Sequence, residues 1–277
     1  MCAAFDMLFR MSFGLRRATH SSMRLAHVAI VGVFWVLPCN RAGAQTQSSA
    51  AGQPAPAAVQ PRVVQPGDSS LRPLTATGAT TYALTLFRDG DEVPVGRLLD
   101  TVRVDTVDGN AVYRRVLTTQ RGTLRLIDST DTDARTLSPR RRRTQQQERR
   151  VLLDFTGRRV KGSLAPQDVP SVPVDTTLPF AAFDAGNWDL VLRAMPLAAG
   201  YQAQFVVFDI DVGLRRYLVA VTGTTTLYGE PTWVVKLTLG RGRESIAWIG
   251  QNTGRLLQLE TTISESTMLR QVLSVQN

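Results

Sequence analysis

The hydrophobic pattern near the C-terminus predicts an antiparallel meander. Three apolar runs are separated by two turns that contain glycine, with the runs at 233–239, 244–249 and 255–263 and the turns at 240–242 and 251–254. Short apolar segments joined by such turns are typical of consecutive hydrogen-bonded strands. Hydrophobic residues alternate from Trp233 to Leu239, so this strand is expected to have one dry and one wet face.

The earlier part of the chain carries the same signals. Further strands are expected at 81–87, 93–106, 111–119, 122–128, 150–155 and 159–164. Asp89-Gly90 is a hairpin turn signal between the first two. Short strands at this spacing predict an all-β fold. Four prolines lie between 165 and 183, which excludes a central strand and favours an extended crossing loop there.

One helix is expected to interrupt the strands. Residues at i, i+3, i+4 and i+7 form a single apolar stripe: Trp188, Val191, Leu192 and Met195. Asp184 is the expected N-cap, and Pro196 and Gly200 end the helix. Two more strands follow over 201–210 and 214–226.

These elements predict a mainly antiparallel all-β fold, as a curved or half-open barrel or sandwich with one short helix packed on the sheet. The strand over 205–210 is apolar on both faces, and a sheet that curves around a helix would bury both. The predicted organisation is a targeting segment over 1–44, a disordered linker over 45–75 and a single β-rich domain over 76–277. The linker is rich in Gln, Ser, Ala, Pro and Gly and has no apolar periodicity.

The first 44 residues resemble a secretory signal peptide preceded by an upstream extension. Met23 is the expected true start, because an uncharged apolar run over 25–37 follows it closely. That run is shorter than the ~20 residues that span a bilayer. Small residues then precede a cleavage site after Ala44, which predicts export to the periplasm. Lipid anchoring at Cys39 is a weaker alternative, because a proline directly precedes it.

Cleavage after Ala44 removes both cysteines and both histidines of the chain. The mature protein then has no disulfide, no thiol nucleophile and no Ser-His-Asp triad. It also lacks the ligands that zinc, copper and haem sites usually need. The sequence therefore predicts a protein that is not an enzyme and has no cofactor and no metal site.

The sequence offers two acidic pairs as candidate sites, with Asp184 and Glu244 as further acids at loop edges. Asp209 and Asp211 lie two residues apart, but only that spacing supports a glycosidase-type pair, and solvated acids are the preferred interpretation. Asp131 and Asp133 resemble part of a calcium loop, but the central glycine and terminal glutamate of such a loop are missing.

The strongest charge feature is a run of four arginines, Arg140, Arg141, Arg142 and Arg143. The net charge is +9, and removing five arginines and one aspartate with residues 1–44 leaves +5. Export argues against a nucleic-acid partner. Two interpretations remain open: a solvated loop, or a contact with an anionic envelope surface such as phospholipid head groups or lipopolysaccharide.

Three motifs carry a resemblance to a known family: the stretches 183–197, 229–236 and 247–257. They resemble the exported bacterial family of unknown function numbered 3108, from about Thr80 to Val272. The resemblance implies a β-rich exported protein similar to the periplasmic lipoprotein carriers, whose half-open barrel curls around a helix and holds acyl chains. It supplies no catalytic residues.

The leading functional hypothesis is a non-enzymatic exported envelope protein that binds a hydrophobic or amphiphilic ligand, such as a lipid or a lipoprotein acyl chain. The residues expected to line its cavity are Trp188, Phe205, Phe208, Trp233 and Trp248. The same side chains would serve as ordinary core. The alternative is therefore a structural or interaction module of the envelope with a solid core and no ligand.

Overall fold

The computed structural model describes residues 61–146, 149–166, 169–239 and 243–274. The expected signal peptide, the linker up to residue 60 and the turn at 240–242 lie outside the described residues. The strands are β1 (Arg62–Val64), β2 (Gly78–Arg88), β3 (Asp91–Val107), β4 (Asn110–Arg121), β5 (Leu124–Asp133), β6 (Pro139–Gln145), β7 (Arg149–Thr156), β8 (Arg159–Pro166), β9 (Val172–Thr177), β10 (Phe183–Asp184), β11 (Gln202–Asp209), β12 (Gly213–Leu227), β13 (Glu230–Thr238), β14 (Glu244–Gly250), β15 (Leu256–Ser264) and β16 (Thr267–Leu273).

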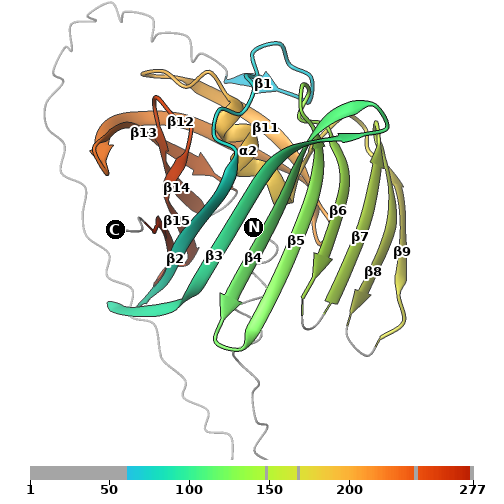
Figure 1. Cartoon of the computed structure of the whole chain (residues 1–277), viewed down its shortest axis with the longest axis horizontal. Helices are drawn as coiled ribbons and strands as arrows, with labels where there is room; N and C mark the ends of the chain where they lie inside the picture. The colour runs from blue at the N-terminus through green and yellow to red at the C-terminus, as the bar shows by residue number, and fades with distance from the viewer. Residues whose placement is uncertain (1–60, 147–148, 167–168, 240–242, 275–277) are drawn as a thin grey trace, which may run out of the picture. The chain divides into compact units, whose positions relative to one another are not determined.

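All described strands belong to one sheet. Its order is β1-β11-β12-β13-β14-β15-β16-β2-β3-β4-β5-β6-β7-β8-β9, and β10 also pairs with β11. Neighbouring strands are antiparallel except β1 and β10, which both run parallel to β11. The sheet curves strongly, but within the described residues β9 forms no ladder with the β1–β11 end (Figure 1). The prediction of a mainly antiparallel, curved and unclosed all-β fold is confirmed.

The predicted C-terminal meander is present as β13, β14 and β15. Trp233 pairs with Ile249, and Ala247 pairs with Leu259 on the next strand. Val235 and Leu237 are fully buried, as the alternation in their strand predicted. The dry face of the meander therefore forms one wall of the core.

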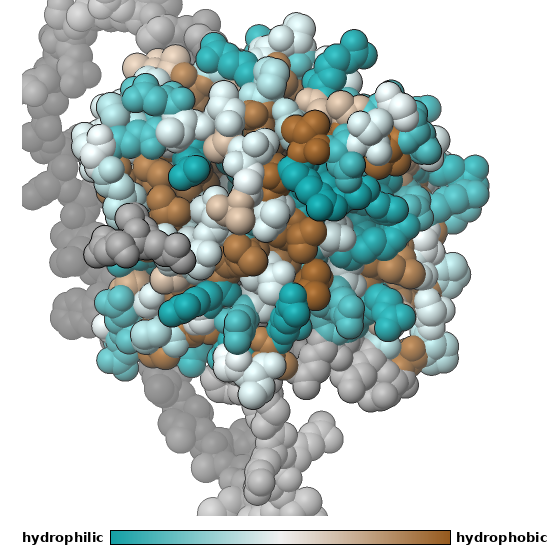
Figure 2. Space-filling model, viewed as in Figure 1, coloured by the Kyte–Doolittle hydropathy of each residue, from teal (hydrophilic) through white to brown (hydrophobic). Residues whose placement is uncertain are grey.

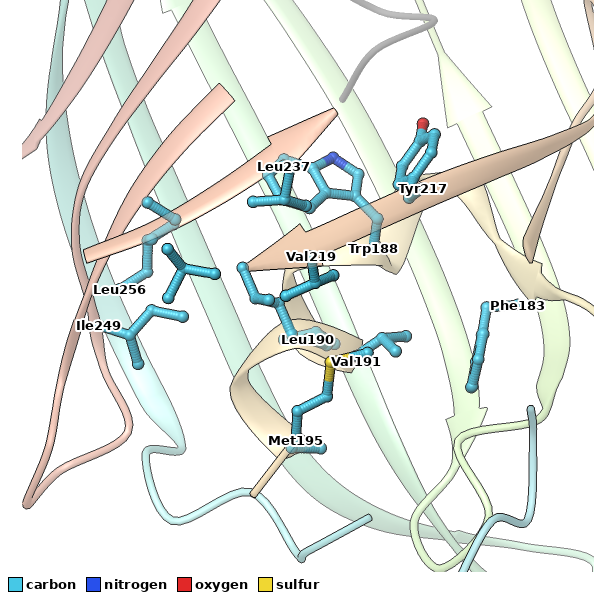
Figure 3. Close-up of a cluster of buried hydrophobic side chains, with 14 of the residues drawn as sticks. Phe183, Trp188, Leu190, Val191, Met195, Tyr217, Val219, Leu237, Ile249 and Leu256 are labelled. Carbon is cyan, nitrogen blue, oxygen red and sulfur yellow. The ribbon is translucent and has the colours of Figure 1, made fainter. Parts of the chain in front are cut away.

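The helix lies where the apolar stripe placed it, but it is shorter and buried on nearly all sides. A 3-10 turn, η1 (Ala185–Asn187), leads into α2 (Trp188–Ala194). Figure 3 shows α2 inside the sheet, with Ile249 and Leu256 on one side and Phe183 on the other. Asp184 stands at the N-cap position of η1, but its side chain makes no capping hydrogen bond, and the N-cap of α2 itself is Asn187. One oxygen of the Asp184 carboxylate accepts a hydrogen bond from Arg142 instead.

Two segments expected to be irregular take part in the sheet. The crossing loop predicted over 165–183 contains the six-residue strand β9, which tolerates Pro173 because an edge strand needs hydrogen bonds on one side only. The predicted linker also gives way to packed chain from β1 onward. Val64 is buried against β11, and the Leu74 amide donates to the Tyr113 hydroxyl at 3.0 Å.

The core consists of two hydrophobic clusters. The larger surrounds α2 and is lined by the inward residues of most strands. The smaller joins β7 and β8 to the β11 end of the sheet, with the rings of Phe155 and Phe208 6.2 Å apart. Arg149 adds an ion pair to Asp211 across the same seam, at 2.6 Å. Side chains therefore hold the two ends of the sheet together where backbone hydrogen bonds do not.

Candidate functional site

A buried arginine on β4 ties the helix to the sheet. Arg115 is 2% exposed, and its guanidinium binds two carboxylates at once. Nε and Nη2 donate to Asp100 on β3 at 2.8 and 2.7 Å. Nη1 and Nη2 donate to Asp189 on α2 at 2.6 and 2.7 Å. The fork of one guanidinium thus meets two carboxylates from elements far apart in the chain.

A second buried arginine, Arg142 on β6, also binds two aspartates, next to the start of η1. Its Nη2 donates to Asp128 at 2.7 Å, and its Nη1 donates to Asp184 at 3.3 Å. Thr144 adds a hydroxyl that donates to Asp128 at 2.8 Å. The other carboxylate oxygen of Asp184 is buried without a hydrogen-bond partner among the described atoms. Gly186 packs so closely here that a Cβ would lie 2.9 Å from that oxygen.

The amide of Asn187 completes the polar contacts of the helix start. Its nitrogen donates to the Thr132 hydroxyl at 2.8 Å, and its oxygen accepts from the Thr130 hydroxyl at 2.9 Å. Both threonines lie on β5 and are buried. The start of the helix is therefore held to the inner face of the sheet by oriented hydrogen bonds as well as by apolar packing.

The pKa values of the buried aspartates are shifted in different directions. Burial raises the pKa of Asp189, but the charge and hydrogen bonds of Arg115 outweigh it, so the pKa lies below its ordinary value. The pKa of Asp128 is likewise lowered, because Arg142 and Thr144 outweigh burial. For Asp184 burial dominates: with the nearby Asp128 charge it outweighs Arg142, and the pKa is raised.

The four arginines of the basic run lie on strand β6, not in a loop, and each is paired with an aspartate. Arg140 binds Asp133 at 2.7 Å, Arg141 binds Asp131, and Arg143 binds Asp154 at 2.6 Å. Arg142 is only 3% exposed. The run alternates along the strand, so one face of it points inward, and the interpretation as a solvated loop is wrong.

The five aromatic candidates fall in different places. Trp188 and Phe205 are buried in the larger cluster, with ring centroids 6.4 and 5.4 Å from that of Tyr217. Phe208 belongs to the smaller cluster. Trp233 is half-buried at the edge of the core, and Trp248 lies on the opposite face from its buried neighbours in β14. The structure therefore brings only Trp188 and Phe205 together.

Two surface clefts are defined by described residues. One, of about 130 Å³, lies at the end of α2 and includes Trp233. The other, of about 150 Å³, lies beside β1 and includes Phe180 and Val206. Both are well below the roughly 300–1,000 Å³ of sites that hold drug-sized ligands.

A comparison of the sequence with models of known protein families finds one match. A family model described as "Protein of unknown function (DUF3108)" matches residues 81–270. The chain belongs to this family. No curated protein matches it.

The other acidic candidates of this DUF3108 protein are engaged in ion pairs or hydrogen bonds. Asp209 is 1% exposed and accepts from the backbone N–H of Asp211 at 2.9 Å. Glu244 pairs with Lys236 at 2.7 Å. Across the described ranges, no group of three or more His, Cys, Asp or Glu residues is arranged to hold a metal ion. In the same residues, no helix is long and apolar enough to cross a membrane.

Sequence reasoning missed the two buried arginine groups of the DUF3108 fold. One signal was available: Arg115 lies on the same side of β4 as Tyr113 and Leu117, and Asp189 directly follows Trp188 in a helix whose only other charged residue is Arg193. A charge on a dry face usually has a buried partner. The partner itself was not predictable, because 74 residues separate the two.

Proposed function

We propose that this protein is a non-enzymatic, exported module of the cell envelope that acts through its surface and has a filled interior. The observation that carries the proposal is that α2 is packed inside the curved sheet, with buried apolar side chains around it. Trp188, Leu190 and Leu192 are each at most 1% exposed there. This favours the solid-core interpretation over a hollow lipid carrier.

The buried charges support the same choice. Opening an acyl-chain cavity would require α2 to leave the sheet, which would separate Asp189 from Arg115. Removing one partner of a buried ion pair costs about 3–5 kcal/mol. That is a large part of the roughly 5–15 kcal/mol that stabilises a typical domain. A ligand that displaced the helix would therefore have to offset this cost as well as the lost apolar packing.

Lipid analysis tests the proposal. The protein would be purified from periplasm without detergent and examined by native mass spectrometry and by lipid extraction. We expect the bare mass of a chain that begins at Gln45 and no lipid at stoichiometric level. About one lipid per chain would contradict the filled interior, and a retained N-terminal segment would contradict the proposed processing.

A contact between the basic run and an anionic surface is the second partner hypothesis, and charge balance weakens it. Each arginine of β6 faces an aspartate, so the field of the run is largely neutralised locally. The test is a triple change of Arg140, Arg141 and Arg143 to Ser, which leaves the buried Arg142 in place. Binding to phosphatidylglycerol vesicles is expected to be unchanged, and a marked loss would restore the contact hypothesis.

A further inference from the structure

The cleft at the C-terminal end of α2 combines positive charge with an apolar wall. Its side chains come from three parts of the fold: the segment before β2, the end of α2, and strands β13 and β14. The residues that matter for recognition are Arg72, Arg193, Met195, Leu197, Trp233 and Ile249. Its volume is about 130 Å³.

Among the described residues, no carboxylate forms a salt bridge with either guanidinium of the cleft, and the charge of Asp189 acts on Arg193 from α2. Arg193 donates from Nε to the Gly254 carbonyl at 3.0 Å and from Nη2 to the Ala76 carbonyl at 2.6 Å. These bonds fix its orientation, and among the described residues its Nη1 has no hydrogen-bond partner. The Arg72 side chain likewise has no hydrogen-bond or salt-bridge partner in the described part of the chain. No carboxylate is among the residues that line the cleft.

Glu230, the first residue of β13, lies beside Gly250 of the cleft lining and is held by hydrogen bonds to the turn after β14. Glu230 accepts from the Thr253 amide at 2.9 Å and from the Thr253 hydroxyl at 2.8 Å. Its carboxylate therefore serves to hold the turn after β14 in place. The Arg72 guanidinium is therefore available to a ligand, whereas Arg193 shares its positive charge with the nearby Asp189 carboxylate.

The apolar wall is part of the rigid core. Met195 and Ile249 are 3% and 2% exposed, and Leu197 and Trp233 pack against the same cluster. Figure 3 shows Met195 at the end of the helix and Ile249 on the strand beside it. A wall fixed in this way needs little reordering when a ligand arrives, which favours binding.

We propose that this cleft binds a small organic carboxylate that carries one compact apolar group. The carboxylate would lie against Arg72 and Arg193, because a guanidinium matches a carboxylate in both charge and geometry. The apolar group would lie against Trp233 and Met195. Its size is limited to at most one ring, since the cleft of about 130 Å³ is slightly smaller than the roughly 150 Å³ cavity that accommodates benzene. The inference goes beyond the proposed function, because it needs no space inside the sheet.

Benzoate is the probe, and titration calorimetry on the mature protein is the assay. We expect saturable binding of one benzoate per chain that weakens as salt is added. Benzamide, which has the same shape but no charge, and acetate, which has the charge but no ring, should each bind at least about tenfold more weakly. Benzoate that fails to saturate, or benzamide that binds as well, overturns the proposal.

Three variants test whether benzoate binds at this cleft. Arg72→Ala should weaken benzoate binding about tenfold, because it removes a charge-assisted hydrogen bond. Asn252→Asp, a nearly isosteric change at a lining residue, should also weaken it by adding a negative charge. Arg125→Ala removes the same charge from an exposed position on β5 outside the cleft and should leave binding unchanged. Equal losses in the Arg72 and Arg125 variants would overturn the assignment.

Nuclear magnetic resonance reports where benzoate binds. Benzoate should shift the indole N–H resonance of Trp233, identified by its loss in Trp233→Phe, and leave that of Trp248 in place. Trp248 lies on the other face of the sheet from the apolar wall. Shifts at Trp248 alone would place the ligand elsewhere and overturn the proposal.

Discussion

Replacing Arg115 by methionine tests the buried charge group most directly. The change keeps much of the side-chain length and apolar volume but removes the guanidinium that four hydrogen bonds join to Asp100 and Asp189. Both carboxylates are at most 4% exposed and would remain in the core without a countercharge. The variant must keep them charged, hydrate them or protonate them.

The cost of protonating the two carboxylates gives an estimate of the lost unfolding free energy. A carboxyl with an unfolded pKa of about 3.9 costs about 1.4 kcal/mol per pH unit to protonate above that value. At about pH 7 this is roughly 4 kcal/mol for one group and 8 kcal/mol for both. We expect Arg115→Met to lose about 4 kcal/mol or more at neutral pH, in line with the 3–5 kcal/mol typical of a broken buried pair.

The loss of unfolding free energy in Arg115→Met should depend on pH. In the wild type the pKa of Asp189 is lowered, so its contribution to stability is present above the unfolded pKa and is lost as pH falls through the folded pKa. Without Arg115 burial raises that pKa, and the folded variant takes up protons. The difference in unfolding free energy between wild type and variant should therefore shrink by at least about 1.4 kcal/mol for each pH unit between about 7 and 5.

Urea unfolding followed by circular dichroism at both pH values measures this difference. The control combines Arg115→Met with Asp100→Asn and Asp189→Asn, which removes the stranded charges. It should recover much of the lost stability at neutral pH and lose the pH dependence of the single variant. A single variant that loses less than about 1 kcal/mol, equally at both pH values, would show that the carboxylates are not confined in a dry core.

Two further comparisons use matched pairs. Asp128→Asn and Asp184→Asn change the two partners of Arg142, but their pKa values are shifted in opposite directions. In unfolding at neutral pH, Asp128→Asn should cost about 3 kcal/mol, whereas Asp184→Asn should be neutral or stabilising; equal losses would contradict this. Gly162→Ala should cost at least about 2 kcal/mol, because φ is +152° and a Cβ would lie 1.8 Å from the Leu152 carbonyl oxygen. Gly223→Ala, with no atom within 4 Å of a Cβ, should change thermal stability by no more than about 0.5 kcal/mol, and similar losses at both glycines would refute the steric argument.

Local patterns in the sequence located most elements of this fold but not the strands β1, β6, β9, β10 and β16. Alternation and turn residues located the meander, and the apolar stripe located α2. They were less reliable where an edge strand tolerates a proline, as in β9, because its pattern resembles a loop. The basic run was misread for a related reason. A strand with arginines on both faces has no hydrophobic alternation, and its inward charge is accepted only because Asp128 and Asp184 lie opposite.

The sequence by itself determined the all-β class, most of the strands and the position of the helix. Tertiary structure alone decided that α2 is buried within the sheet, that the seam between the sheet ends is held by side chains, and that Arg72, Arg193 and Trp233 line one cleft. The physical reason is the separation along the chain over which each effect acts. Periodicity and turn preference act over a few residues, whereas the curvature of a sheet brings together side chains separated by up to about 180 positions, as with Arg72 and Asn252.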